Sequence, residues 1–300
     1  MNSVPRPGGA SELRHYTGSP PLTRPAVSLD CQPYWHPSHT AIRRDLAAAF
    51  GEPYSRLAIY YDALLGDWFF PKLQRVFKWL VRTYDVRFAS AADVACGTGR
   101  FVRYLEALEV PIVFGVDRSI PMLEIAMARN PTGRARFFHQ DFVTLALPHP
   151  VDLITCNFDS LNYILKDREL VKAITKFRQN LRPNGHVIFD MITDAPTWPA
   201  EDTFLERRII GDQVVARVMR WFPRLKIQHT SMRFGVREPI EEIHIQRGYS
   251  EHEVLGALHR AGLVLRVALD FERLGAVGRM TTRAIYVARR GPGRHTPGRN

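Results

Sequence analysis

Two glycines stand one residue apart in the stretch DVACGTGR, which runs from Asp93 to Arg100 and joins an apolar run to an amphipathic run. Glycine has no Cβ, so the backbone at Gly97 and Gly99 leaves room for a ligand to approach closely. In open α/β sheets, ligands bind at the carboxyl edge of the strands, where a strand-to-helix turn of this kind lies. The stretch therefore predicts a cofactor site at such a turn.

The type of cofactor follows from what the loop lacks and from what comes after it. A dinucleotide fingerprint, G-x-G-x-x-G, needs a third glycine, and Val102 stands there instead. Asp117, at the end of the next apolar run, is placed to accept the hydroxyls of a ribose. A nucleoside cofactor without a pyrophosphate fits both observations, and S-adenosylmethionine is one. Asp93 can hold the ammonium of its amino-acid tail, directly or through water.

An alternation of short apolar runs and helical patterns follows from residue 88 onward. We expect strands at 91–95, 111–117, 134–141, 151–158 and 186–192, with helices at 100–108, 119–130 and 167–181 between them. Strands that alternate with crossover helices indicate a parallel sheet. We therefore predict the α/β class, with a doubly wound Rossmann-like sheet of about seven strands and helices on both faces.

The pattern changes between 202 and 248, where no helical period is present. Turn signals at Gly211-Asp212 and Pro223-Arg224 separate β-rich runs, which predicts three or four antiparallel strands inserted after the fifth parallel strand. A helix then begins at Ser250 with a capping box to Glu253, and Gly262 ends it. Two closing strands are expected at 264–272 and 281–290.

Composition limits the partners and the compartment. The formal net charge is +11, but the basic residues are scattered, which argues against a nucleic-acid partner. No run of about 18 apolar residues predicts a membrane span, and the amino terminus does not resemble a signal peptide. The three cysteines, Cys31, Cys96 and Cys156, have neither disulfide-framework nor metal-ligand spacing, so we expect no metal. These features predict a soluble, cytoplasmic protein.

Five motifs occur in order along the chain: ADVACGTGRFVRYL, VFGVDRSIPMLEIA, FFHQDFVTL, VDLITCNFDSLNYIL and LRPNGHVIFDM. Together they resemble the successive motifs of class I S-adenosylmethionine-dependent methyltransferases, over about residues 55 to 289. One departure is Ala95, which stands where many members of that family carry a first glycine. The resemblance implies a domain over 39–290 with a β lid at 202–248. Disordered tails are expected at 1–38 and 291–300, the second of them basic.

The resemblance also implies a position along the cofactor for several residues. Those that line the methionine part are Ala95, Cys96, Gly97 and Gly99. Those at the ribose and adenine are Asp117, Arg118, Met122, Asp141 and Phe142. Those around the reacting sulfonium are Tyr61, which closes over the cofactor, and Asn157 and Phe158, which follow the fourth strand.

For the acceptor, the resemblance implies a small molecule methylated at nitrogen or oxygen beneath the lid. Asp159 and His244 are candidates for a catalytic base or polar anchor, Asn162 and Tyr163 for polar contacts, and Arg247 for pairing with an acidic acceptor. The turn NFDS after the fourth strand has no proline, unlike the turn of enzymes that methylate DNA bases. An RNA or protein acceptor and a non-catalytic scaffold remain as alternatives, whereas Val102 disfavours a nicotinamide dehydrogenase.

Overall fold

A computed structural model of the chain describes residues 52–131, 133–195, 204–235 and 240–291. All of these belong to one compact unit, Ser38–Asn300. The tail predicted at 1–38, Cys31 and the tail predicted at 291–300, apart from Gly291, lie outside the described residues.

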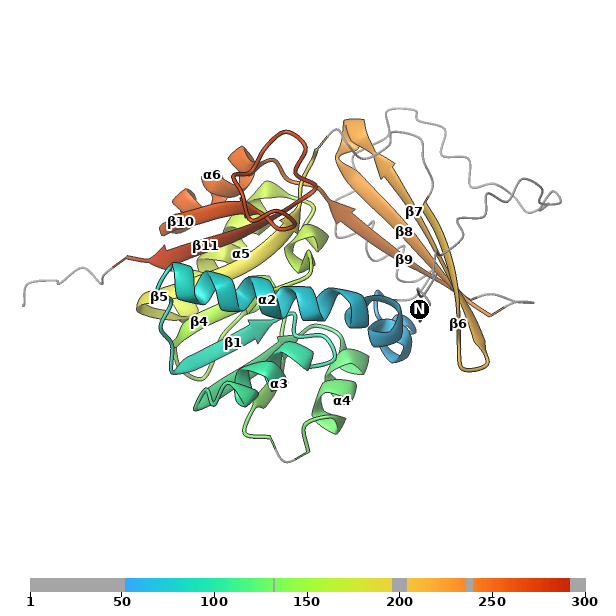
Figure 1. The fold of residues 1–300 in the computed structure, drawn as a ribbon, viewed down its shortest axis with the longest axis horizontal. Helices are drawn as coiled ribbons and strands as arrows, with labels where there is room; N and C mark the ends of the chain where they lie inside the picture. The colour runs from blue at the N-terminus through green and yellow to red at the C-terminus, as the bar shows by residue number, and fades with distance from the viewer. Residues whose placement is uncertain (1–51, 132, 196–203, 236–239, 292–300) are drawn as a thin grey trace, which may run out of the picture. The chain divides into compact units, whose positions relative to one another are not determined.

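The main sheet has seven strands in the order β10-β11-β5-β4-β1-β2-β3. The first five strands in sequence run parallel to one another, while β11 pairs antiparallel with both β5 and β10. The strands are β1 (Ser90–Val94), β2 (Ile112–Asp117), β3 (Arg136–His139), β4 (Val151–Cys156), β5 (Leu181–Ile192), β10 (Leu263–Asp270) and β11 (Arg283–Arg290). The sequence prediction of a doubly wound α/β sheet is confirmed (Figure 1).

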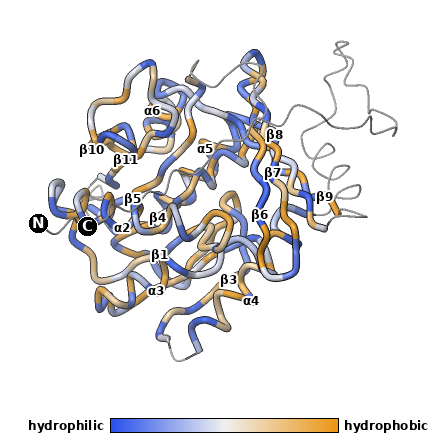
Figure 2. The backbone as a smooth tube through the Cα atoms, turned by 45° about the vertical axis from the view of Figure 1, so that its right-hand side comes forward, coloured by the Kyte–Doolittle hydropathy of each residue, from blue (hydrophilic) through white to orange (hydrophobic). Residues whose placement is uncertain are grey.

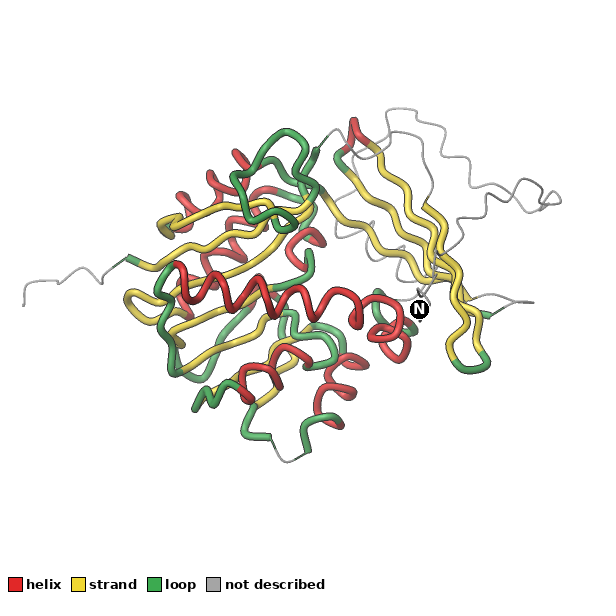
Figure 3. The backbone as a smooth tube through the Cα atoms, viewed as in Figure 1, coloured by secondary structure: helices red, strands yellow, loops and turns green. Residues whose placement is uncertain are grey.

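Helices cover both faces of this sheet because each central strand is buried on both sides. One face packs against α2 (Asp67–Thr83), α3 (Arg100–Ala107) and α4 (Ile120–Ala128), and the other against α5 (Asp167–Asn180) and α6 (Glu251–Ala261). Two short helical turns, η1 (Leu57–Tyr60) and η2 (Asp62–Gly66), lead into α2. Figure 3 shows these helices on either side of the strands.

Helix ends follow the capping signals in the sequence. The Ser250 hydroxyl accepts from the Glu253 backbone N–H, the Glu253 carboxylate accepts from the Ser250 N–H, and Gly262 ends α6 with a φ of 75°. Ser119 caps α4 in the same way, through the N–H of Met122. These caps orient α4 and α6, the helices that follow β2 and the lid.

The lid is a separate antiparallel sheet inserted between β5 and α6, as predicted. Its strands, in spatial order, are β6 (Phe204–Ile210), β7 (Gln213–Phe222), β8 (Ile227–Phe234) and β9 (Ile240–Arg247). Gly211, with a φ of 63°, forms the predicted turn between β6 and β7, and the short helix η5 (Pro223–Leu225) joins β7 to β8. Figure 2 shows the mixed hydropathy of these strands.

The end of the lid nearest the main sheet is fixed by polar contacts. Lys226 pairs with Asp194 and with Glu253, and its carbonyl accepts from the backbone N–H of Gly248. A bridge between Thr193 and Tyr249 continues the main sheet toward β9. These contacts hold β9 near the carboxyl end of β5.

The described residues contain no helix that is long and apolar enough to cross a membrane. Within the same residues, no group of three or more His, Cys, Asp or Glu side chains is arranged to hold a metal ion.

The capping box of α6 gives a test of the fold. Ser250→Ala removes an N-cap hydroxyl, which costs about 1 kcal/mol, and should lower the melting temperature by about 2 °C in a domain of this size. Thermal unfolding followed by circular dichroism measures this, with the exposed His252→Ala on the same turn as control. Equal melting temperatures for the two variants would contradict a stabilising role of the capping box.

Candidate active site

The carboxyl ends of β1, β2, β4 and β5 lie along one edge of the main sheet, because these strands are parallel neighbours. The loops that leave this edge contain most of the residues that the sequence singles out. Residues from the lid and from the segment before α2 approach the same edge.

The two glycines of the loop after β1 serve different purposes. A Cβ built on Gly97 would meet no atom within 4 Å, so this position leaves open space beside the backbone. A Cβ on Gly99 would lie 2.9 Å from the Cβ of Ala126 in α4. Open space therefore lies beside Gly97, whereas Gly99 lets α4 pack closely against the loop.

Asp117, at the end of β2, ties two loops together. One carboxylate oxygen accepts from the backbone N–H of Gly97 at 2.7 Å, and the other accepts from that of Ser119 at 2.8 Å. Burial raises the pKa of Asp117 above its ordinary value, although these N–H groups favour the charged form. A carboxylate has about four acceptor positions, so Asp117 retains capacity for hydroxyl groups of a ligand.

Asp93 and Asn157 form a buried polar pair beneath the loop. One oxygen of Asp93 accepts from the Thr155 hydroxyl at 2.7 Å and from the Asn157 amide at 3.2 Å. Burial raises the pKa of Asp93 to about 7. The amide oxygen of Asn157 is buried and has no hydrogen-bond donor among the described residues. The pair therefore offers an unsatisfied acceptor next to a titratable carboxyl group.

The residues predicted at the adenine gather at the ends of β2 and β3. Arg118 donates to Glu52 at 2.9 Å and lies 3.6 Å from the carboxylate of Asp141. Asp141 in turn accepts from the backbone N–H of Val143, and the half-buried Phe142 packs on the core. The structure thus brings Arg118 and Asp141 together.

Three other residues predicted along the cofactor lie in or below the loops. Met122 is 2% exposed in the first turn of α4, and Cys96 is 6% exposed behind the glycine loop. Ala95 has a φ of 60°, a conformation that glycine adopts more easily, which is consistent with the family glycine at this position.

The turn after β4 is held in a conformation that most residues avoid. Phe158 and Asp159 both have left-handed backbone angles, with φ of 57° and 49°. The buried carboxylate of Asp190, on β5, accepts from the N–H of Phe158 at 2.5 Å and from that of Asp159 at 3.1 Å. Arg283 pairs with Asp190, and its guanidinium lies over the Phe158 ring. Phe158 also stacks on Phe69, with 3.9 Å between ring centroids.

Asp159, one of the two candidate bases, has its carboxylate engaged on both sides. One oxygen lies 2.7 Å from the Arg283 guanidinium, and the other accepts from the Gln246 amide at 2.5 Å. The geometry favours Asp159 as an anchor between the turn and β9.

His244, the other candidate base, is 4% exposed on β9 and bonds through both ring nitrogens. Nδ1 lies 2.7 Å from the Tyr163 hydroxyl, and Nε2 lies 2.7 Å from the Glu242 carboxylate. The Tyr163 hydroxyl lies 2.7 Å from that of Tyr54. A continuous hydrogen-bonded chain therefore runs from the lid to the segment before η1.

Glu242 holds that segment to the lid. Its carboxylate is fully buried and accepts from the backbone N–H groups of Tyr54 at 2.6 Å, Arg56 at 2.7 Å and Leu57 at 3.1 Å. Burial alone would raise the pKa of Glu242, but the hydrogen bonds from His244 and from these N–H groups bring it below the ordinary value.

Tyr61 completes an aromatic wall at this edge. Its ring packs edge-on against Tyr54, with 5.9 Å between centroids, and lies 6.2 Å from the Phe158 ring. Burial raises the pKa of the Tyr54, Tyr61 and Tyr163 phenols well above the ordinary value, so all three remain protonated.

Two of the predicted acceptor contacts are used within the fold. Asn162 is fully buried and donates to the carbonyls of Ile192 and Arg247. Arg247 donates to Asp167 at 2.7 Å and to Glu253 at 2.6 Å. Their polar groups therefore join η4 (Ser160–Tyr163), β5 and α6.

Sequence reasoning missed Tyr54, Glu242, Asp190 and Arg283. Glu242 had a usable signal, because residues two apart on a strand share a face and His244 was already singled out. Tyr54, Asp190 and Arg283 lie far from their partners along the chain, so no local spacing indicates them.

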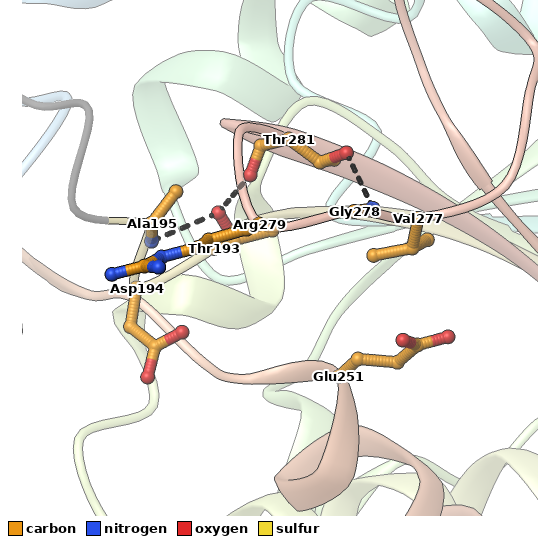
Figure 4. Close-up of a pocket in the computed structure, with 8 residues that line it drawn as sticks. All are labelled: Thr193, Asp194, Ala195, Glu251, Val277, Gly278, Arg279 and Thr281. Carbon is orange, nitrogen blue, oxygen red and sulfur yellow. Dashed lines mark hydrogen bonds between the residues drawn. The ribbon is translucent and has the colours of Figure 1, made fainter.

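A hollow of about 300 Å³ lies beside this edge, beyond the end of β5 (Figure 4). Its lining residues are Thr193, Asp194, Ala195, Glu251, Val277, Gly278, Arg279 and Thr281. Hydrogen bonds from Thr193 to the Thr281 carbonyl and from Gly278 to the Thr281 hydroxyl close part of its wall. None of the predicted site residues lines it.

Comparison with known proteins identifies the domain. Residues 91–185 match the family model described as a methyltransferase domain. The chain is 28% identical over 251 residues to a putative methyltransferase of Geobacillus sp. (strain WCH70), covering 79% of this chain and 99% of that protein.

Two further matches extend the comparison. The chain is 35% identical over 123 residues to the dTDP-3-amino-3,6-dideoxy-alpha-D-glucopyranose N,N-dimethyltransferase of Streptomyces fradiae, covering 41% of this chain and 45% of that enzyme. A crystal structure of an S-adenosylmethionine-dependent methyltransferase from Clostridium acetobutylicum has the same fold, with a TM-score of 0.68, 24% identity and coverage of 79% and 99%. The chain is a class I S-adenosylmethionine-dependent methyltransferase.

Proposed function

We propose that this enzyme transfers a methyl group to the amine nitrogen of a small-molecule acceptor, enclosed between the strand ends and the lid. The observation that carries the proposal is the closure of the lid by Glu242, which binds three backbone N–H groups of residues 54–57. This contact brings the half-buried phenols of Tyr54, Tyr61 and Tyr163 to one side of the proposed site. An aromatic-lined site suits a small molecule better than a macromolecule.

The cofactor is S-adenosylmethionine, and the described residues fit it. The open space at Gly97 accommodates a ligand against the backbone, and the unsatisfied amide oxygen of Asn157 beside Asp93 suits the ammonium of its amino-acid tail. Asp117 would bind the ribose, while Arg118 and Met122, with Asp141 and Phe142, would surround the adenine. The cofactor supplies an electrophilic methyl group on a sulfonium.

The chain's residues around the methyl group would align the acceptor and exclude water. Phe158 and Tyr61 would border the sulfonium, because the Asp190 and Arg283 contacts fix the turn after β4. Asp159, paired with Arg283 and Gln246, would hold this turn to β9. We propose that the domain spans 39–290, with residues 202–248 as its lid.

An amine acceptor is supported by the relatives. The Streptomyces fradiae relative is an N,N-dimethyltransferase of a dTDP-linked amino sugar, according to its name. An amine attacks a methyl carbon once it has lost its proton, whereas an alcohol needs a stronger base. We therefore propose an amino sugar, or a similar amine, as the acceptor class.

The proposal is tested by methyl transfer from S-adenosylmethionine, followed by mass spectrometry of the acceptor. The acceptor panel is dTDP-3-amino-3,6-dideoxy-alpha-D-glucose, a simple phenol and total tRNA. We expect a mass gain on the amino sugar alone. Transfer to tRNA, with a steep loss of binding at higher salt, would replace the small-molecule proposal.

The two glycines can be separated experimentally. Gly97→Ala places a methyl group in the space proposed for the cofactor, so it should weaken binding of S-adenosylhomocysteine at least tenfold. The left-handed φ of 53° at this position costs an alanine about 1 kcal/mol, so the melting temperature should also fall. Gly99→Ala forces a contact with Ala126 and should lower the melting temperature more. Calorimetric titration and thermal unfolding measure the two effects. Unchanged affinity in a folded Gly97→Ala protein would remove Gly97 from the cofactor site.

Asp93 gives a pH prediction. Its pKa of about 7 means that the carboxyl group is largely protonated at pH 6.5 in the free protein. A nearby ammonium favours the carboxylate, so cofactor binding should release a fraction of a proton, and affinity should rise as the pH increases through about 7.

Calorimetry at pH 6.5 in two buffers of different ionisation enthalpy measures this proton release. The control is Asp93→Asn, which should release none. Equal apparent enthalpies in both buffers for the unmodified protein would contradict the role of Asp93 at the ammonium.

A further inference from the structure

We propose that Tyr54, Tyr163, His244 and Glu242 form a relay that accepts the proton of the acceptor's ammonium group. The proposal rests on the amine acceptor proposed above and assigns the step that makes this amine nucleophilic. Tyr54 is the residue that would touch the acceptor, and the other three act through it as positioning residues.

The relay is continuous, and it runs from the half-buried Tyr54 and Tyr163 to the buried His244 and Glu242. The Tyr54 and Tyr163 hydroxyls lie 2.7 Å apart, Tyr163 lies 2.7 Å from His244 Nδ1, and His244 Nε2 lies 2.7 Å from Glu242. These distances are within the range for strong hydrogen bonds. The four residues come from the segment before η1, from η4 and from β9, so the relay forms only when the lid is in place.

Glu242 sets the direction of every bond in the relay. Its carboxylate can only accept, because three backbone N–H groups also donate to it. Nε2 of a neutral His244 therefore carries the proton, which leaves Nδ1 as an acceptor. Tyr163 then donates to Nδ1, and Tyr54 donates to the oxygen of Tyr163. This order leaves the lone pairs of the Tyr54 oxygen to accept a hydrogen bond from an N–H group of the amine substrate.

The outer end of the relay lies at the proposed site. The Tyr54 ring contacts Tyr61, which lies beside Phe158 at the end of β4. The carboxylates of Asp159 and Asp117 are close enough to contribute to the raised pKa of Tyr54, after burial and Tyr163. Through Tyr61, the Tyr54 ring thus adjoins the turn after β4.

The proton step balances within the four residues. Tyr54 oxygen takes a proton from the acceptor's ammonium, and the N–H bond that breaks leaves its electron pair on nitrogen. Tyr54 passes its own proton to Tyr163, and Tyr163 passes its proton to Nδ1 of His244. The imidazolium that forms lies against the Glu242 carboxylate, which stabilises it as the aspartate of a catalytic triad stabilises its histidine. Return of the proton to water resets the relay.

Charged groups of both signs surround His244. Glu242 lies two residues away on β9, and Arg217 on β7 shares this face of the lid. Thr230 lies opposite His244 in the register, so the neighbouring His229 points to the other face. Burial lowers the pKa of His229, so that ring is neutral when the relay takes up a proton. The Tyr163 phenol from η4 and the Tyr54 phenol complete the titratable surroundings.

The test compares Tyr54→Phe and Tyr163→Phe with Tyr60→Phe, whose ring stacks on Phe234 outside the relay. With the amine that the unmodified enzyme methylates, each relay variant should lose about 100-fold in kcat, with little change in KM and with unchanged affinity for S-adenosylhomocysteine. The double variant should lose no more than either single one. Tyr60→Phe should retain full activity.

The pH profile separates a relay from a structural contact. His244→Gln removes the end point of the relay, so the dependence of kcat/KM on pH should change shape in this variant relative to the unmodified enzyme. A profile of unchanged shape in His244→Gln, or full kcat in Tyr54→Phe, would overturn the relay.

A readout without turnover keeps the relay distinct from the proposed function. Nitrogen NMR at pH 8, assigned by the loss of one signal in His244→Gln, should show His244 neutral and protonated at Nε2, and Glu242→Gln should abolish this preference. A proton on Nδ1, or on both nitrogens, would overturn the relay. If no amine is methylated while His244 carries its proton on Nε2, the proposed acceptor class is contradicted. The direction of the hydrogen bonds in the relay is still supported in that case.

Discussion

Buried carboxylates that accept backbone N–H groups hold the active-site edge together. Asp117 fixes the glycine loop to the start of α4, Asp190 fixes the left-handed turn after β4, and Glu242 fixes residues 54–57 to the lid. Each carboxylate sits on a strand, which is rigid, and each binds a loop, which would otherwise vary. Charge-assisted hydrogen bonds of this kind are about twice as strong as neutral ones. The positions of the reacting groups therefore depend on the strands more than on the loops themselves.

Much of the fold could be predicted from local patterns. The alternation of strands and helices, the capping box at Ser250 and the turn at Gly211 all depend on neighbouring residues, and the structure contains them. The packing role of Gly99 could not be predicted, because its contact with Ala126 joins two helices of different βα units. The proposed relay could not be predicted either, because Tyr54 and Glu242 are 188 residues apart in the sequence and come into contact only in the folded chain.

In the proposed mechanism, the lid connects the binding of the acceptor with the transfer of its proton. Gln246 reaches Asp159 in the turn after β4, while Glu242 holds the segment that carries Tyr54 and leads to Tyr61. The same strand, β9, therefore contacts both sides of the proposed acceptor position. A substitution that loosens β9 would be expected to disturb substrate alignment and proton transfer together, because both depend on one rigid element.

The most direct test of the central claim is a crystal structure of the full chain with S-adenosylhomocysteine. The ligand is predicted to lie against Gly97, with its ribose on the Asp117 carboxylate, its ammonium beside Asn157, and its sulfur facing the Tyr54 hydroxyl beneath the lid. A ligand bound elsewhere, or no ligand at this edge under saturating conditions, would contradict the assignment of the site.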